Sequence, residues 1–262
     1  MIDFHNHVLP NIDDGSISME MSLSMLENAA NQGITDVVNT VHYQHPKVDK
    51  VDTSFERIIR EIEKLQSALD GDSIPIKLHI GSEVFYLPNL LSIIDDPITT
   101  IGNGRYMLVE FLPNHIPETH KQVFFDLKMS GVTPIIAHPE RYKPIQKDIG
   151  LVYNWLNAGC FIQIDAGSIL GLFGRESKNA AELIVKNSWC QIMGSDAHNN
   201  RNRNFILNDA YNIVQDWVGD DANYLVYDNP KAILEGEDIR IKIEENIHVE
   251  SKFWNKFKIR KR

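Results

Sequence analysis

The chain has 262 residues and a mass of 30.0 kDa, which fits one large domain or two small ones. Hydrophobic residues make up 43 % of it and charged residues 24 %, values that exclude a disordered chain, a collagen-like repeat and a disulfide-stapled miniprotein. The formal net charge of −10 argues against nucleic acid as the main partner.

Short apolar runs alternate along the chain with longer amphipathic segments. Nearly continuous apolar runs are typical of strands that are buried on both faces of a parallel sheet. They predict strands at Ile2–Phe4, Val37–Thr40, Ile76–Ile80, Met107–Glu110, Pro134–Ala137, Phe161–Ile164 and Gln191–Gly194. Apolar residues at helical spacing predict helices between these strands, at about 18–32, 55–69, 119–129, 151–157, 177–187 and 207–217.

Seven strand–helix units in one domain of this length predict a (β/α) barrel, one unit short of eight. An open, doubly wound α/β sheet is the competing architecture. A nucleotide-binding version of that sheet is disfavoured, because no G-x-G-x-x-G or G-x-x-x-x-G-K-[ST] loop follows any predicted strand. We place the barrel in residues 1–236 and a C-terminal extension in residues 237–262.

Histidines and carboxylates follow the predicted strands at the point where each strand ends. In a parallel barrel these positions meet at the C-terminal face, where active sites are built. Five of the ten histidines in the chain share this placement, and we interpret the other five, His45 among them, as structural or solvated. The set comprises His5, His7, His42, His138 and His198, together with Asp14, Glu83, Glu110 and Asp196.

This mixture of side chains indicates metal binding. Imidazole and carboxylate ligands suit Mn²⁺, Fe²⁺ or Zn²⁺. Nine ligands exceed the need of one ion, and two or three ions close together require bridging carboxylates. Such a cluster holds a water-derived hydroxide near neutral pH and clamps phosphate oxygens during in-line displacement. On spacing alone, Asp13 could replace Asp14 in this set.

Five motifs in the chain are similar, in order, to those of a known family. They are MIDFHNHVLPNIDDG, GSEVF, RYMLVEF, TPIIAHPER and GSDAHNNRNRNF, and they span residues 1–205. The chain resembles the PHP superfamily (polymerase and histidinol phosphatase). Within it, the chain is similar to the manganese-dependent protein-tyrosine phosphatases of bacterial capsule and exopolysaccharide loci. The resemblance, which is only loose over residues 219–262, implies a distorted (β/α)7 TIM-like barrel with its metal site at the C-terminal face of the strands.

The resemblance also implies a role for each candidate residue in a cluster of three Mn²⁺ ions, with Fe or Zn in some positions. Glu83 would bridge two of the ions, and His42 and Asp196 are catalytic as well as metal-binding candidates. The ligands would form three groups: His5, His7, Glu83 and Asp196; then Glu83, Glu110 and His138; then Asp14, His42 and His198.

Two arginines are expected to bind the substrate phosphate. By the resemblance they are Arg141, in the HPER motif, and Arg203, which follows D-A-H. A phosphotyrosine dianion needs guanidinium donors, because these match phosphate geometry bidentately. The alternative is that both arginines form surface salt bridges, and Arg201 lies near enough in the chain to substitute for Arg203.

These features predict an enzyme, a metal-dependent protein-tyrosine phosphatase. By the resemblance, its substrate is the tyrosine-rich tail of a membrane-associated capsule kinase, so that it regulates polysaccharide synthesis. Cysteine-based phosphatase chemistry is excluded, because neither Cys160 nor Cys190 has an arginine six positions on; both are predicted to be buried free thiols. The alternatives are a small-molecule phosphomonoesterase, such as histidinol phosphatase, and a non-catalytic, metal-stabilised scaffold that binds a kinase.

The two ends of the chain bear on its location. The sequence MIDFHNHVLP has no basic segment followed by an apolar stretch, and no run of about twenty apolar residues occurs, so we expect a cytoplasmic protein. Residues 252–262 carry six basic residues and no acidic one, which leaves −16 for the rest of the chain. This tail is either a solvated terminus or a weak contact with anionic lipid at the inner face of the membrane.

Overall fold

Seven parallel strands form one sheet, and their order in the sheet is their order in the chain. The computed structural model describes residues 1–48 and 51–239. The strands are β1 (Ile2–Asn6), β2 (Asp36–Tyr43), β3 (Lys77–Phe85), β4 (Tyr106–Glu110), β5 (Thr133–Ala137), β6 (Phe161–Asp165) and β7 (Ile192–Gly194). Each of the seven predicted strands is confirmed.

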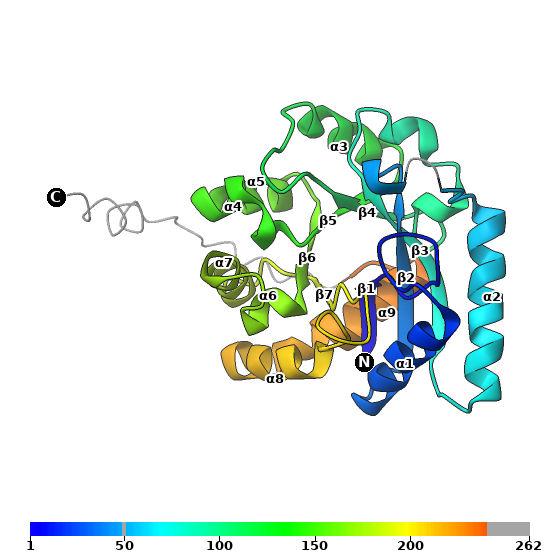
Figure 1. Cartoon of the computed structure of the whole chain (residues 1–262). Helices are drawn as coiled ribbons and strands as arrows, with labels where there is room; N and C mark the ends of the chain where they lie inside the picture. Colours follow the sequence, from blue (N-terminus) through cyan, green and yellow to red (C-terminus); the bar gives the residue numbers. More distant parts are fainter. Residues whose placement is uncertain (49–50, 240–262) are drawn as a thin grey trace.

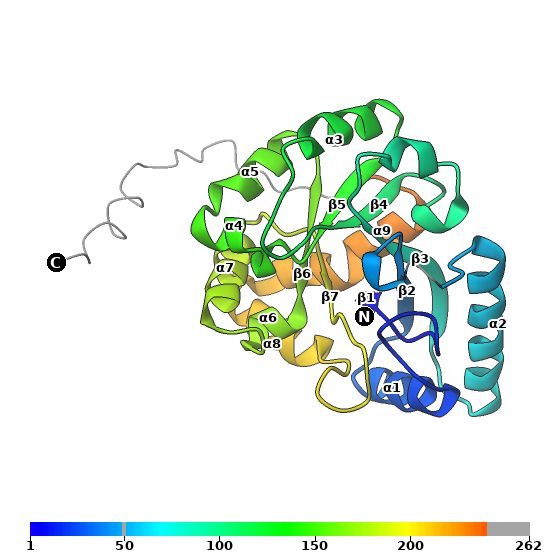
Figure 2. The ribbon, with the colours of Figure 1, turned by 45° about the horizontal axis from the view of Figure 1, so that its top comes forward.

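The sheet curls until its first strand meets the segment that follows its last. The backbone N–H of Asp196 donates to the carbonyl of His5 at 2.7 Å, and the backbone N–H of His7 donates to the carbonyl of Ala197 at 2.8 Å. Asn6 and Ala197 form a parallel bridge. The result is a nearly closed (β/α)7 barrel, so the open, doubly wound alternative is wrong (Figure 2).

Helices surround the strands on the outside (Figure 1). The α-helices are α1 (Met19–Asn31), α2 (Phe55–Gly71), α3 (His120–Met129), α4 (Lys143–Lys147), α5 (Gly150–Asn157), α6 (Ala166–Leu170), α7 (Arg175–Lys186), α8 (Leu207–Val218) and α9 (Asn229–Glu235). Short 3-10 turns lie at Pro46–Val48, Leu90–Ile93, Pro97–Thr99, Pro139–Arg141 and Gly219–Asp221, and a π-helical turn at Tyr224–Asp228. The sequence predicts α1, α2, α3, α5, α7 and α8, and it misses the short helices α4, α6 and α9.

Four strands, β1, β2, β3 and β6, continue past the C-terminal ends of their predicted apolar runs. Because β1 ends at Asn6, β2 at Tyr43 and β3 at Phe85, three candidate ligands lie within strands rather than after them. His42 and Glu83 are direct register partners in the β2–β3 pair. Backbone pairing with the neighbouring strand keeps these polar residues in the sheet, so apolar patterning alone places the strand ends too early.

Two apolar clusters hold the barrel together. The larger one lies between the strands and the helices that cover them, and it contains both cysteines, which are buried free thiols as predicted. The smaller one draws on strands from around the barrel and includes Phe4, Leu108 and Ile135 together with Ile233 of α9, so it lies inside. This inner cluster fills the end of the barrel opposite the candidate ligands.

The described part of the predicted extension packs on the barrel. The hydroxyl of Tyr106 donates to the carbonyl of Glu237 at 2.5 Å, Arg105 pairs with Asp238, and Ile239 joins the inner cluster. Residues 240–262, with the basic tail at 252–262, lie outside the described residues. Within the described ranges, no helix has the length and apolarity needed to cross a bilayer.

Candidate metal centre

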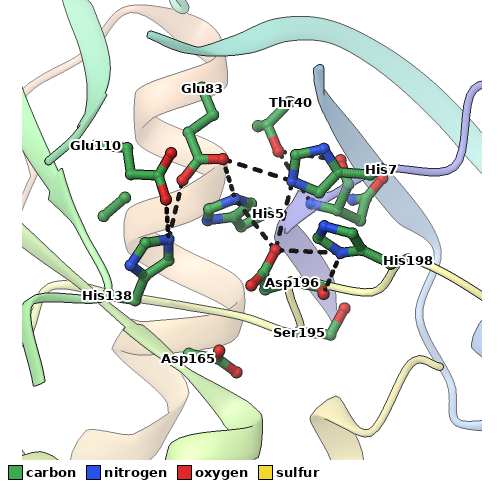
Figure 3. A network of polar contacts seen from close by, with 12 residues as sticks. His5, His7, Thr40, Glu83, Glu110, His138, Asp165, Ser195, Asp196 and His198 are labelled. Atoms are coloured by element: carbon green, nitrogen blue, oxygen red, sulfur yellow. Dashed lines mark hydrogen bonds and ion pairs between the residues drawn. The ribbon is translucent and has the colours of Figure 1, made fainter. Parts of the chain in front are cut away.

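The nine candidate ligands lie together at the C-terminal ends of the strands. Figure 3 labels seven of them, all except Asp14 and His42. They form overlapping groups in which the potential donor atoms lie within 4.8 Å of one another. The groups are His7, Asp14, His42 and His198; His5, His7 and Asp196; His5, Glu83 and His138; and His42, Glu83 and Glu110. The barrel thus brings together residues that are up to 193 positions apart in the chain, from His5 to His198.

The spacing between these atoms suits an ion. His42 Nε2 lies 3.2 Å from Asp14 Oδ1, His5 Nε2 lies 3.3 Å from Glu83 Oε2, and His7 Nε2 lies 3.4 Å from Asp196 Oδ1. Two ligand atoms that each lie about 2.0–2.2 Å from one tetrahedral ion are about 3.3–3.6 Å apart. The three separations are therefore close to those expected between ligands of a shared ion.

Several of these buried nitrogens have no hydrogen-bond partner. They are His5 Nε2, His7 Nε2 and both ring nitrogens of His42, and the rings of all three histidines are almost fully buried. An unsatisfied buried polar atom costs about 1–3 kcal/mol, so a cluster of them in a folded protein calls for an explanation. A set of bound cations supplies it for His5 Nε2, His7 Nε2 and one nitrogen of His42, because a neutral imidazole can coordinate an ion through one ring nitrogen.

Neighbouring groups hold three of the imidazoles with one nitrogen turned toward the site. His7 Nδ1 lies 2.7 Å from Asp13 Oδ2, and His5 Nδ1 lies 3.1 Å from the amide oxygen of Gln163. His198 Nδ1 lies 2.8 Å from the carbonyl of Asp196. A proton on Nδ1 in each ring leaves Nε2 as the electron-pair donor, which is how metal-binding histidines are oriented in proteins.

Asp13 and Asp14 occupy different positions. The buried carboxylate of Asp13 lies behind His7 and also accepts the backbone N–H of His42 at 3.0 Å. Asp14 lies on the other side, with Oδ1 at 3.2 Å from His42 Nε2 and 3.4 Å from His198 Nε2. The geometry therefore favours Asp14 as the candidate ligand and Asp13 as the residue that orients His7.

Local backbone geometry shapes the site. His138 and Asp196 adopt left-handed backbone conformations, with φ of 32° and 47°, which are uncommon for residues with side chains and are found at functional sites. Gly15 and Gly194 allow other segments to approach the H-x-H motif. A Cβ on Gly15 would lie 2.1 Å from the His7 carbonyl oxygen, and one on Gly194 would lie 2.6 Å from His5 Cβ.

Neighbouring carboxylates raise the pKa values of two imidazoles at the centre. Burial opposes a charge on His5, but the carboxylates of Glu83 and Asp196 outweigh burial and raise its pKa to about 8. Burial likewise opposes a charge on His42, but the nearby carboxylates of Asp14 and Glu83 raise its pKa to about 9. Without metal, protons held between imidazoles and carboxylates thus neutralise part of the buried negative charge.

Two arginines converge on one carboxylate at the edge of the centre. Arg141 Nη1 lies 2.5 Å from Asp196 Oδ2 and 3.1 Å from Asp165 Oδ2, and Arg203 Nη2 lies 2.7 Å from Asp196 Oδ2. The other oxygen, Oδ1, faces the imidazoles of His5 and His7. Both arginine side chains stay partly exposed, at 25 % and 31 %, so their remaining N–H groups can reach a ligand. Among the described ion pairs, none involves Arg201.

Sequence reasoning missed several residues at this centre. Asp165 is the last residue of β6 and directly follows the predicted strand Phe161–Ile164, so the strand-end pattern marks it as it marks His5, although the candidate set omits it. His45 is buried, with its ring 4.5 Å from that of His42 and its Nε2 3.7 Å from Glu110 Oε2, so a solvated His45 is wrong. No sequence signal marks Gln163, because a lone glutamine in a strand is unremarkable.

Residues 1–235 match the model of a family described as "Capsular polysaccharide synthesis, CpsB/CapC". The chain belongs to the CpsB/CapC family. This membership confirms the resemblance drawn from the five motifs.

Two relatives illustrate how far the similarity to other CpsB/CapC proteins extends. The chain is 32 % identical over 213 residues to the putative tyrosine-protein phosphatase CapC of Staphylococcus aureus, covering 81 % of this chain and 82 % of the relative. It is 30 % identical over 241 residues to the tyrosine-protein phosphatase YwqE of Bacillus subtilis, covering 91 % and 93 %.

Crystal structures of CpsB/CapC proteins share the fold. One crystal structure comes from a study of YwqE from Bacillus subtilis and CpsB from Streptococcus pneumoniae, which it describes as unique metal-dependent tyrosine phosphatases. It superposes on this chain with a TM-score of 0.87 at 29 % sequence identity. The superposition covers 92 % of this chain and 97 % of the other. The whole barrel, and not only the motifs, is therefore common to this chain and that structure.

Proposed function

We propose that this protein is a metal-dependent phosphatase that hydrolyses phosphotyrosine on protein substrates. The observation that carries the proposal is the convergence of five imidazoles, four carboxylates and two arginines at the C-terminal face of the barrel. The functions named for its CpsB/CapC relatives support the choice of substrate. The description of the matching family supports a role in capsular polysaccharide synthesis.

The residues of the centre fit a cluster of divalent metal ions. In this proposal His5, His7, Glu83 and Asp196 hold one ion, and Glu83 is shared with a second. The remaining ligands are Glu110 and His138 for the second ion, and Asp14, His42 and His198 for the third. The mixed oxygen and nitrogen donors without thiolate suit Mn²⁺, with Fe or Zn as alternatives in some positions. When bound, such ions supply Lewis-acid stabilisation of the phosphate oxygens and activation of water.

The arginines act on the substrate rather than on the metal. Their guanidinium groups offer in-plane N–H donors to phosphate oxygens and stabilise the negative charge that the oxygens carry in the transition state. Asp196 links the two systems, because Oδ2 receives both arginines while Oδ1 faces His5 and His7. This carboxylate therefore fixes the position of the phosphate donors relative to the metal ligands.

The partner and the location are inferred from the proposed substrate. A phosphotyrosine substrate in a capsule-synthesis setting favours a membrane-associated bacterial tyrosine kinase, dephosphorylated on its tyrosine-rich tail. We infer that the phosphatase acts in the cytoplasm, where such a tail would be exposed. The basic residues at 252–262 would add a weak contact with anionic lipid near that kinase.

The proposal is tested by comparing substrates under defined metal conditions. The purified chain is stripped with a chelator, checked by elemental analysis, and reloaded with Mn²⁺. We expect hydrolysis of a phosphotyrosine peptide to disappear without metal, to return with Mn²⁺, and to exceed hydrolysis of histidinol phosphate. Turnover by verified metal-free protein would contradict the metal dependence. Preference for histidinol phosphate would indicate a small-molecule phosphatase, and metal binding without any turnover would indicate a scaffold.

A further inference from the structure

A short glycine-flanked loop after α6 presents two apolar side chains beside the metal centre. Gly171 and Gly174 have φ of 87° and 91°, in the left-handed region that favours glycine. They enclose Leu172 and Phe173, which are 59 % and 36 % exposed. Because α6 directly follows β6, this loop belongs to the C-terminal face of the barrel, where the candidate ligands gather.

The ring of Phe173 is fixed between two elements of that face. The Cζ atom of Arg141 lies over the ring, 4.5 Å from its centroid. Phe173 also packs against the backbone of α6, since a Cβ on Gly167 would lie only 2.7 Å from Phe173 Cε2. The ring is therefore held in place although more than a third of its surface remains exposed.

This arrangement divides the guanidinium of Arg141 into a face and an edge. The face stacks on Phe173, while Nη1 at the edge donates to Asp165 and Asp196. Stacking on an aromatic face leaves in-plane N–H donors free for hydrogen bonds. A phosphate bound at the edge of Arg141 would thus have the exposed ring of Phe173 next to it. The guanidinium of Arg141 lies between this ring and Asp196.

We propose that Phe173 is a specificity-determining residue that contacts the aromatic ring of the substrate and favours aryl over alkyl phosphates. The inference rests on the proposed function, since it concerns the substituent on the phosphate that Arg141 binds. An aryl ester brings a ring that packs edge-to-face or offset against Phe173 and covers its exposed surface. A phosphoserine carries no aromatic ring that could make that contact. Phe173 also positions Arg141 through the stacking contact.

Two non-hydrolysable ligands separate the ring contact from the phosphate contact. Phenylphosphonate and methylphosphonate carry the same dianionic head and differ in the ring. Their dissociation constants are measured by calorimetry on Mn²⁺-loaded protein, for the native chain and for Phe173→Leu. We expect Phe173→Leu to weaken phenylphosphonate roughly 3- to 10-fold more than methylphosphonate, as loss of one aromatic contact predicts. Phe173→Trp should restore most of the preference.

The matched control is Phe125→Leu on α3, an equally conservative change at a side chain that is 59 % exposed and outside the centre. It should leave both dissociation constants unchanged. Equal weakening of the two phosphonates by Phe173→Leu, or no weakening, would overturn the ring contact. Because the ratio is internal to each protein, a partly unfolded variant does not change it. Turnover of a phosphotyrosine peptide is measured separately, so failure of the proposed function remains distinguishable from failure of this inference.

Discussion

The two ends of the barrel are built from the same strands but carry opposite kinds of side chain. At the N-terminal end, Phe4 of β1 and Leu108 of β4 pack into the inner apolar cluster. One residue further along β1 lies His5, and two residues further along β4 lies Glu110, both in the metal centre. The change from apolar to polar therefore takes place within a few ångströms along both of these strands.

This difference separates stability from function. The apolar end contributes by burial, so its substitutions lower the free energy of unfolding and leave the chemistry of folded molecules intact. The polar end buries charges whose mutual compensation is complete only with cations present. Its substitutions should therefore change metal binding and turnover far more than the stability of the metal-free protein. Substitutions at the two ends test this separation.

The largest effect is expected for Asp196→Asn. The substitution keeps the size of the side chain but removes the charge that faces His5 and His7 through one oxygen and both arginines through the other. Loss of several kcal/mol of metal-assisted stabilisation predicts a fall of roughly 10³-fold in turnover, together with lost metal. Turnover and bound Mn²⁺ are measured on the same samples. Asp165→Asn is the control, because Asp165 shares the contact with Arg141 but lies in none of the candidate metal groups. Equal loss of metal in both variants would contradict a ligand role for Asp196.

Arg141→Ala should affect turnover without affecting metal. Its guanidinium contacts Asp196 and Asp165 and none of the imidazoles in the described ion pairs. Removing one donor that stabilises transition-state charge lowers kcat by roughly 10²–10³-fold. Elemental analysis should find the same metal content as in the native protein. Arg201→Ala, two residues from Arg203, is the control and should change little, since Arg201 is exposed. If Arg141→Ala lost metal, and this loss accounted for all of the lost turnover, Arg141 would have no role in binding phosphate.

The sequence predicts most of the strands and helices of the barrel, and each element or strand end that it misplaces has an identifiable cause. Apolar runs locate all seven strands, because a strand buried on both faces must be apolar over most of its length. They misplace the ends of β1, β2 and β3, where polar ligands continue the ladder. Short helices such as α6 escape detection because five residues give too little periodicity.

The candidate site divides in the same way. Residues that lie at strand ends and fall in linked motifs, such as His7 and Asp196, could be selected from the sequence. Residues that act through another side chain could not, because their partners are distant in the chain. Gln163 meets His5 across 158 positions, and only the closed barrel brings them together.

Asp13→Asn should weaken metal binding without abolishing it. Asp13 Oδ2 accepts from His7 Nδ1 and from the backbone N–H of His42, so the substitution disturbs the orientation of two candidate ligands. Loss of such an orienting carboxylate lowers metal affinity by roughly 10–100-fold. Asp14→Asn, which replaces a candidate ligand, should lower the occupancy of one ion altogether. Calorimetric titration with Mn²⁺ distinguishes the two, and a larger effect at Asp13 than at Asp14 would reverse their assignments.

Acid should displace metal from the centre. The pKa of His5 is raised to about 8 and that of His42 to about 9 by neighbouring carboxylates, after burial has opposed the charge. Below these values the metal-free imidazoles hold protons that an ion must displace, so Mn²⁺ affinity falls as pH falls from 9 to 6. The Mn²⁺ affinity changes by at most about tenfold per pH unit for each displaced proton. Titrations across this range measure it, and an affinity independent of pH would contradict imidazole ligation.

The smallest effect on chemistry is expected at the apolar end, for Ile233→Ala. Ile233 lies on α9, is fully buried, and packs in the inner cluster with Phe4 and Ile135. Truncation leaves a cavity and lowers the free energy of unfolding by about 2–5 kcal/mol. Because no candidate ligand contacts this helix through the described ion pairs or hydrogen bonds, metal content and kcat per folded molecule should match the native protein. Urea denaturation of the metal-free protein gives the stability change, and Mn²⁺ titration below the unfolding transition gives the affinity. If Ile233→Ala lost metal affinity in proportion to its loss of stability, the apolar end would also set the geometry of the metal centre. The two ends of the barrel would then act as one unit.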